Sequence, residues 1–177
     1  RWTGNVKLTH RIRESLETIS PLQLMTDEVL DHGTSVPLCL LTKNLPDVKI
    51  IPAYYSYRSH EEHFDFGKIL KGELQKSRER IAVIASGDLS HRLTKNAPAG
   101  YSPKGKKFDN KLIEYLQNQE TEKILNMDEN LIKEAGECGL RSILILLGVM
   151  SNMTYSPELF SYESPFGVGY LVMNFKL

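Results

Sequence analysis

The chain has 177 residues, and its 22 Lys and Arg residues balance 22 Asp and Glu residues, so the formal net charge is zero. This length suits one domain with its own hydrophobic core, and we expect a single domain over residues 1–177. The balanced charge and the lack of a basic cluster argue against nucleic acid as a partner. No apolar stretch is long enough to span a membrane, and two cysteines are too few for a disulfide framework, which indicates a soluble cytoplasmic protein.

The first residue, Arg1, is not an initiating methionine, which suggests that the chain is part of a longer protein. Apolar residues recur at helical spacing over 6–19, so a helix is predicted there, ending at Ser20 and Pro21. A short helix is predicted to begin after Thr34, with Thr34 or Ser35 as its cap and Pro37 in its first turn.

The next segments alternate between strand-like and helix-like sequence patterns. The β-branched and aromatic content of residues 48–57 predicts a strand, and residues 66–80 return to helical period. Residues 81–86, "IAVIAS", are continuously apolar, as in a strand that helices cover on both faces. A loop is predicted over 94–107.

The remaining elements are predicted as three helices, at 108–118, 120–126 and 139–152, followed by strands at 158–163 and 167–175. Helices interspersed with strands predict an α/β fold, namely a three-layer helix-sheet-helix sandwich with a mostly parallel or mixed sheet. The aromatic and β-branched terminal strands could present an exposed edge, which favours a homodimer.

The segment "SGDLSH" places Asp88, Ser90 and His91 beyond the carboxyl end of the 81–86 strand, where α/β proteins bind ligands. A histidine there is well placed to accept a proton near neutral pH. The alternative is that Asp88 and Ser90 cap a turn and that His91 is a surface residue. Serine hydrolysis is disfavoured because the G-x-S-x-G pattern is absent.

Two further segments carry candidate residues. In "LDHGTSVPL", Asp31 can accept a hydrogen bond from His32 or from the backbone, and Gly33 permits close approach of a ligand, although a plain turn into a helix is favoured. In "EAGECGLR", Glu137 either caps the following helix or binds a metal, and Cys138 is either a thiolate ligand or a small buried residue. For His60 and His63 in "SHEEHF", solvation is favoured over metal binding.

Five blocks in this order, "LDHGTSVPL", "IAVIASGDLSH", "AGYSPKGKKFD", "AGECGLRSILILLG" and "SPFGVGYLVMNF", resemble the catalytic subunits of class III extradiol ring-cleavage dioxygenases. More narrowly, they resemble the LigB-like domain of AmmeMemoRadiSam proteins, which are relatives of Memo. The resemblance covers residues 30–175. It implies a non-haem Fe(II) ion held by two histidines and a carboxylate, and a catechol-like aromatic substrate.

On that pattern, His91 is the acid/base residue and His32 contacts the substrate or bound oxygen. The carboxylate ligand is Glu137, or Cys138 replaces it as in Memo-like relatives. The remaining candidates for substrate binding are Asp31, Gly33, Asp88 and Ser90.

The family's two metal-binding histidines lie upstream of the DHG block and have no counterpart in this chain. We therefore expect Fe(II) to require the full-length protein, and the fragment alone to be inactive. An alternative function is a Memo-like binding or redox module, working beside a radical-SAM partner and an AMMECR1-like domain.

Overall fold

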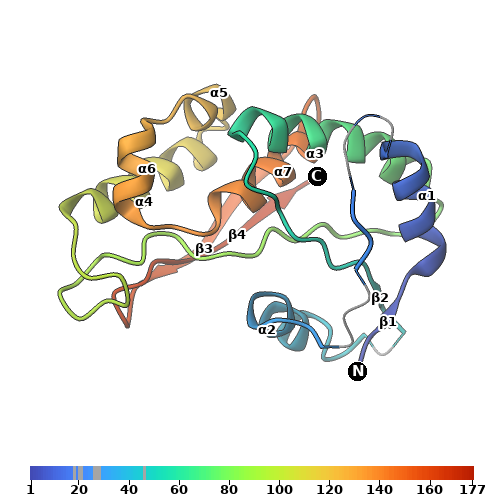
Figure 1. The fold of residues 1–177 in the computed structure, drawn as a ribbon, viewed down its shortest axis with the longest axis horizontal. Helices are drawn as coiled ribbons and strands as arrows, with labels where there is room; N and C mark the ends of the chain where they lie inside the picture. Colours follow the sequence, from blue (N-terminus) through green and yellow to red (C-terminus); the bar gives the residue numbers. More distant parts are fainter. Residues whose placement is uncertain (18, 20–21, 26–28, 46) are drawn as a thin grey trace.

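A computed structural model describes residues 1–17, 19, 22–25, 29–45 and 47–177 (Figure 1). In chain order its elements are β1 (Thr3–Gly4), α1 (Val6–Leu16), α2 (His32–Leu41), β2 (Lys49–Ile50), α3 (His60–Gln75), α4 (Pro103–Gln117), α5 (Thr121–Leu125), α6 (Glu129–Ala135), α7 (Leu140–Met150), β3 (Ser156–Glu163) and β4 (Tyr170–Lys176). The α/β class expected from the sequence is confirmed, because helices and strands are interspersed along the described chain.

The strands of the described residues form two separate pairs. Strands β1 and β2 are parallel, whereas β3 and β4 form an antiparallel hairpin with an irregularity between Leu159 and Ser161. The strand expected over 48–57 is therefore reduced to its first residues. The single larger sheet of a three-layer sandwich stays a prediction.

The segment 81–86 differs most from its expected structure. It is extended, but it pairs with no strand within the described chain, and Ile81 and Ile84 are 38% and 47% exposed. The prediction of a buried strand is wrong here, because a strand buries its side chains only when neighbours cover it. Helix α2 likewise buries none of its residues, although it is rich in apolar side chains.

The hydrophobic core lies between helices α4 to α7 and the β3–β4 hairpin. Its largest fully buried side chains are Leu89, Phe108, Leu112, Leu116, Ile124, Leu140 and Leu144. Helix α3 packs closely against α7 where Gly67 meets Gly148. A side chain on either glycine would collide with the backbone of the other helix, so these two helices approach as closely as backbones allow.

Several helix boundaries differ from the predicted ones. Helix α2 begins at His32 with Asp31 as its cap, so Pro37 lies inside the helix rather than in its first turn. Helix α3 begins at His60, because Ser59 and Glu62 form a capping box. Helix α6 was not expected. The predicted end of the first helix, at Ser20 and Pro21, lies outside the described residues.

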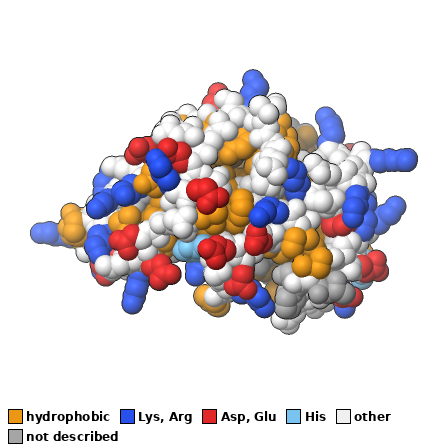
Figure 2. Space-filling view, turned by 90° about the horizontal axis from the view of Figure 1, so that it is seen from above, with side chains coloured by type: hydrophobic (Ala, Val, Ile, Leu, Met, Phe, Trp, Pro, Cys, Tyr) orange, Lys and Arg blue, Asp and Glu red, His pale blue; other side chains and the backbone are white. Residues whose placement is uncertain are grey.

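The surface in Figure 2 mixes acidic, basic and hydrophobic side chains, without one sign of charge covering this face. Within the described chain, no helix combines the length and the apolar character that crossing a membrane requires. Both cysteines are free, and Cys39 is exposed whereas Cys138 is half-buried.

Candidate metal site

The loop of residues 87–93 is fixed by hydrogen bonds on several sides. The N–H of Leu89 donates to the carbonyl of Gly169 (2.8 Å), and the N–H of Gly169 donates to the carbonyl of Ser90 (2.8 Å). Ser90 is fully buried, and its hydroxyl donates to the carbonyl of Ala135 (2.8 Å). Ser90 therefore helps to hold the loop, and its role in substrate binding stays a prediction.

A buried carboxylate reinforces this loop from α4. Asp109 Oδ1 accepts the N–H of Ser90 (2.8 Å), and Asp109 Oδ2 accepts the hydroxyl of Tyr162 (2.6 Å). Burial raises the pKa of Asp109, and these two hydrogen bonds partly offset that effect. Since Ser90 immediately precedes His91, Asp109 helps to determine where the imidazole lies.

Two glycines bring the loop against the start of α7. Gly87 has a positive φ of 157°, and a side chain there would collide with the Cα of Gly139. The carbonyl of Asp88 then accepts the N–H groups of Cys138 (3.2 Å) and Gly139 (2.9 Å). The N–H of Asp88 in turn donates to Cys138 Sγ (3.2 Å). These hydrogen bonds hold Asp88 and Cys138, which are 50 positions apart in the sequence, next to each other.

Asp88, His91 and Cys138 form a group of three side chains of metal-ligating types, here called the metal-ligating group, and their candidate ligand atoms all lie within 4.8 Å of one another. His91 Nε2 lies 3.4 Å from Asp88 Oδ2 and 3.7 Å from Cys138 Sγ. The side chains of His91 and Asp88 are 28% and 41% exposed, so solvent and small molecules reach the group. Burial raises the pKa of the Cys138 thiol, which keeps it protonated unless a cation binds nearby.

Glu137 lies beside this group but has another partner. Its Oε2 accepts the N–H of Leu140 (2.6 Å), so it satisfies a donor at the first turn of α7. Burial raises the pKa of Glu137, and the nearby charges of Arg141 and His91 act in the opposite direction. Of the two adjacent residues that the sequence left open as metal ligands, the structure groups Cys138 with His91 and Asp88.

The DHG block lies at the start of α2. Asp31 Oδ1 accepts the N–H of Thr34 (2.8 Å), which lowers the pKa of Asp31. His32 is exposed, and within the described chain its ring has no hydrogen-bond partner. The carbonyl of Gly33 accepts the hydroxyl of Ser86 (2.6 Å), so the block touches the segment that leads to Asp88. A hollow shared by His32, His91 and Glu137 stays a prediction.

Sequence reasoning missed two residues near the metal-ligating group, Tyr55 and Arg141. The Arg141 guanidinium lies over the Tyr55 ring at 5.9 Å from its centroid. Burial raises the pKa of the Tyr55 phenol. The position of Tyr55 near the carboxyl end of a predicted strand was the signal that could have found it.

The histidines of "SHEEHF" do not form a metal site with each other. His63 is buried, and its two ring nitrogens lie 2.7 Å from the carbonyl oxygen of Ser59 and 3.1 Å from that of Ser56. Its predicted solvation is therefore wrong, because the ring holds the turn before α3. His60 is half-buried, and burial lowers its pKa, as does the charge of Arg141.

The chain is similar to known proteins over most of its length. The family model described as "Catalytic LigB subunit of aromatic ring-opening dioxygenase" matches residues 1–173. The chain is also similar to Protein CA_C1420 of Clostridium acetobutylicum, with 40% identity over 151 residues. That alignment covers 85% of this chain and 32% of the relative, so the chain spans about a third of the relative's length.

Proposed function

Because the chain belongs to the family of catalytic LigB subunits of aromatic ring-opening dioxygenases, we propose that it contributes the catalytic site of an enzyme that opens a catechol-like ring with non-haem Fe(II). The observation that carries this proposal is the convergence of Asp88, His91 and Cys138 from two distant segments. This convergence adds a chemical reason to the family membership, since fold alone does not transfer an activity.

The donor atoms of the group suit a transition-metal ion. They are a carboxylate oxygen, an imidazole nitrogen and a sulfur, and the separations from His91 Nε2 are 3.4 and 3.7 Å. Donors that bind one ion at about 2.0–2.3 Å lie at such separations from each other. Non-haem iron oxygenases typically use three protein donors on one side of the ion and leave the other positions open.

Of these three side chains, we assign Cys138 and Asp88 as donors to the ion, together with the upstream histidines that the family resemblance implies for the full-length protein. We assign His91, which lies within reach of the same ion, as the residue that moves protons. A bound cation would favour the Cys138 thiolate, which burial otherwise disfavours. His91 lies beside the Asp88 carboxylate, an arrangement that orients an imidazole for accepting the proton of a phenolic hydroxyl. When bound, Fe(II) would supply the site at which a catechol and dioxygen react.

The proposal is tested with the full-length protein, loaded with Fe(II) without oxygen and then given oxygen and a catechol. A yellow ring-opened product and matching oxygen consumption are expected. Cys138→Ala should lose most of the bound iron, whereas the adjacent Glu137→Gln should keep it. His91→Gln should keep the iron and lose turnover by about 100-fold or more.

Other outcomes would change the proposal in defined ways. Loss of iron in His91→Gln would show that His91 is a metal ligand rather than the acid/base residue. Full iron content in Cys138→Ala would remove the assigned site. A protein that neither binds iron nor consumes oxygen with any catechol would favour the non-catalytic binding module instead.

A further inference from the structure

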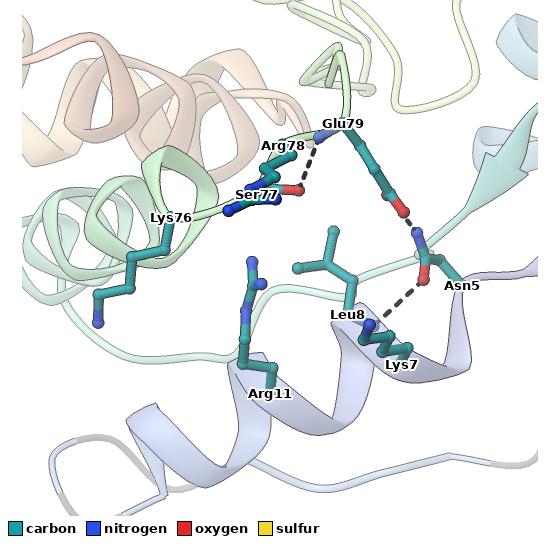
Figure 3. A pocket seen from close by; sticks show the side chains of 8 residues that line it. All are labelled: Asn5, Lys7, Leu8, Arg11, Lys76, Ser77, Arg78 and Glu79. Carbon is teal, nitrogen blue, oxygen red and sulfur yellow. Dashed lines mark hydrogen bonds between the residues drawn. The ribbon is translucent and has the colours of Figure 1, made fainter.

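A second site lies away from the metal-ligating group, where the start of α1 faces the end of α3 (Figure 3). A cavity of about 350 Å³ opens there. It is lined by Asn5, Lys7, Leu8, Arg11, Lys76, Ser77, Arg78 and Glu79. Four of these eight residues are cationic and one is acidic, although the whole chain has no net charge.

The acidic residues near the cavity do not neutralise all of these cations. Glu79 accepts a hydrogen bond from Asn5 Nδ2 (2.8 Å), and Figure 3 shows its side chain reaching toward Asn5. Lys76 pairs with Glu73 (2.5 Å), which lies outside the lining. For Lys7, Arg11 and Arg78, the described residues offer no ion pair within 4.0 Å.

Arg11 is held in place and still has an unused donor. Its Nη2 donates to the carbonyl of Glu73 near the end of α3 (3.1 Å), which fixes the guanidinium against that helix. Its Nε is buried, and within the described chain it has no hydrogen-bond partner. A buried donor without an acceptor is costly, so an acceptor from a ligand would relieve this cost.

The cations that line the cavity also repel one another, which costs electrostatic free energy. Lys7 and Arg11 are four residues apart on α1, and like charges at this spacing repel each other. The segment that follows α3 brings Arg78 to the same cavity, together with the Ser77 hydroxyl. That hydroxyl accepts the N–H of Glu79 (3.2 Å) and keeps its own hydrogen for donation. An anion with several acceptor oxygens would satisfy these groups together.

We propose that this cavity binds the phosphoryl group of a small molecule, as inorganic phosphate or as a phosphate ester. Three cations that have no ion pair among the described residues suit a doubly charged anion better than a single carboxylate. Guanidinium groups match the geometry of phosphate oxygens, and Arg11 is already positioned by Glu73. The one acidic lining residue, Glu79, is held away from Arg11 by Asn5.

The test is calorimetric titration of the chain with inorganic phosphate, ribose 5-phosphate and acetate at low ionic strength. Saturable, one-to-one binding of phosphate or of the ester is expected, with acetate at least tenfold weaker. The comparison of phosphate with the ester identifies the source of the phosphoryl group. Arg11→Gln and Arg78→Gln should each weaken binding about tenfold, which is the size expected for one charge-assisted hydrogen bond.

Two further variants separate a specific site from general attraction. Glu79→Gln should strengthen phosphate binding, because it removes the one acidic group of the cavity. Lys107→Gln, at an exposed position of α4, removes the same charge elsewhere and should leave the affinity unchanged. The proposal is overturned if phosphate does not saturate, if acetate binds equally well, or if the exposed Arg78→Gln variant, which should fold normally, binds phosphate as tightly as the parent chain.

Discussion

Ser86 donates a hydrogen bond from its hydroxyl to the carbonyl of Gly33, at 2.6 Å. In a regular helix this carbonyl would accept the N–H of the residue four positions later, but that residue is Pro37, which has no N–H. The proline therefore leaves an acceptor free inside α2, and Ser86 satisfies it. This contact links the DHG block to the segment that carries Asp88.

Removing the Ser86 hydroxyl should loosen α2 from the 81–86 segment. We expect Ser86→Ala to lower the free energy of unfolding by about 0.5–1.5 kcal/mol, and to speed amide hydrogen exchange in α2. In a Pro37→Ala background the helix regains its own N–H donor for Gly33, so the same serine substitution should cost less. Additive effects in this double-mutant cycle would show that the two residues do not share the carbonyl.

Two glycines of α3 should respond in opposite ways to the same substitution. A side chain at Gly67 would meet the backbone of α7, so Gly67→Ala should destabilise the protein by about 1–3 kcal/mol. At Gly72 a Cβ atom would meet nothing within 4 Å, and Gly72→Ala should stabilise the helix by about 0.5–1 kcal/mol. Urea unfolding of both variants measures the difference, and equal effects would contradict the close packing of α3 on α7.

The elements that the sequence predicted well are those with a strong local pattern. The expected helix at 139–152 corresponds to α7, and the expected terminal strands correspond to β3 and β4. The segment 81–86 was mistaken because its apolar run is local, whereas pairing depends on a distant neighbour. Helix α6, with its short length of seven residues, gave too weak a periodic signal.

The candidate site was predictable in its motifs but not in its contacts. The sequence singled out the segments of His91 and Cys138 as candidates for chemistry, and it left Cys138 and Glu137 open as alternative metal ligands. In the structure Glu137 accepts the N–H of Leu140 at the first turn of α7, a contact that the sequence alone does not show. Tyr55 and Arg141 come together only through the tertiary fold, so no sequence spacing connects them.

Asp109 should make stability depend on pH in a defined direction. Burial raises its pKa in the folded state above the ordinary value, so the folded protein holds this proton more tightly than the unfolded chain does. The stabilisation from the protonated form is present below the ordinary pKa of about 4 and is lost as pH rises through the raised value.

Asp109→Asn should abolish this part of the pH dependence. The difference in unfolding free energy between parent and variant should therefore shift in favour of the variant as pH rises from about 4 to 7. Asp65→Asn is the control, since Asp65 is exposed and its ion pair with Lys68 is on the surface. Parallel stability curves for the parent and Asp109→Asn would show that burial does not govern this carboxyl.

Gly139 tests whether the close approach of two loops builds the metal site. A side chain there would lie 2.9 Å from the carbonyl oxygen of Asp88 and 3.0 Å from that of Gly87, closer than such atoms pack. Gly139→Ala should push the two segments apart, weaken the hydrogen bonds that the Asp88 carbonyl accepts, and separate Asp88 from Cys138. We expect a stability loss of about 1–3 kcal/mol and at least tenfold weaker binding of Co(II), followed through sulfur-to-metal absorbance.

Gly4→Ala is the control for Gly139→Ala, because Gly4 has open space around it, and this variant should bind Co(II) like the parent. Unchanged Co(II) affinity in a folded Gly139→Ala variant would mean that the Asp88 and Cys138 side chains do not act on one ion.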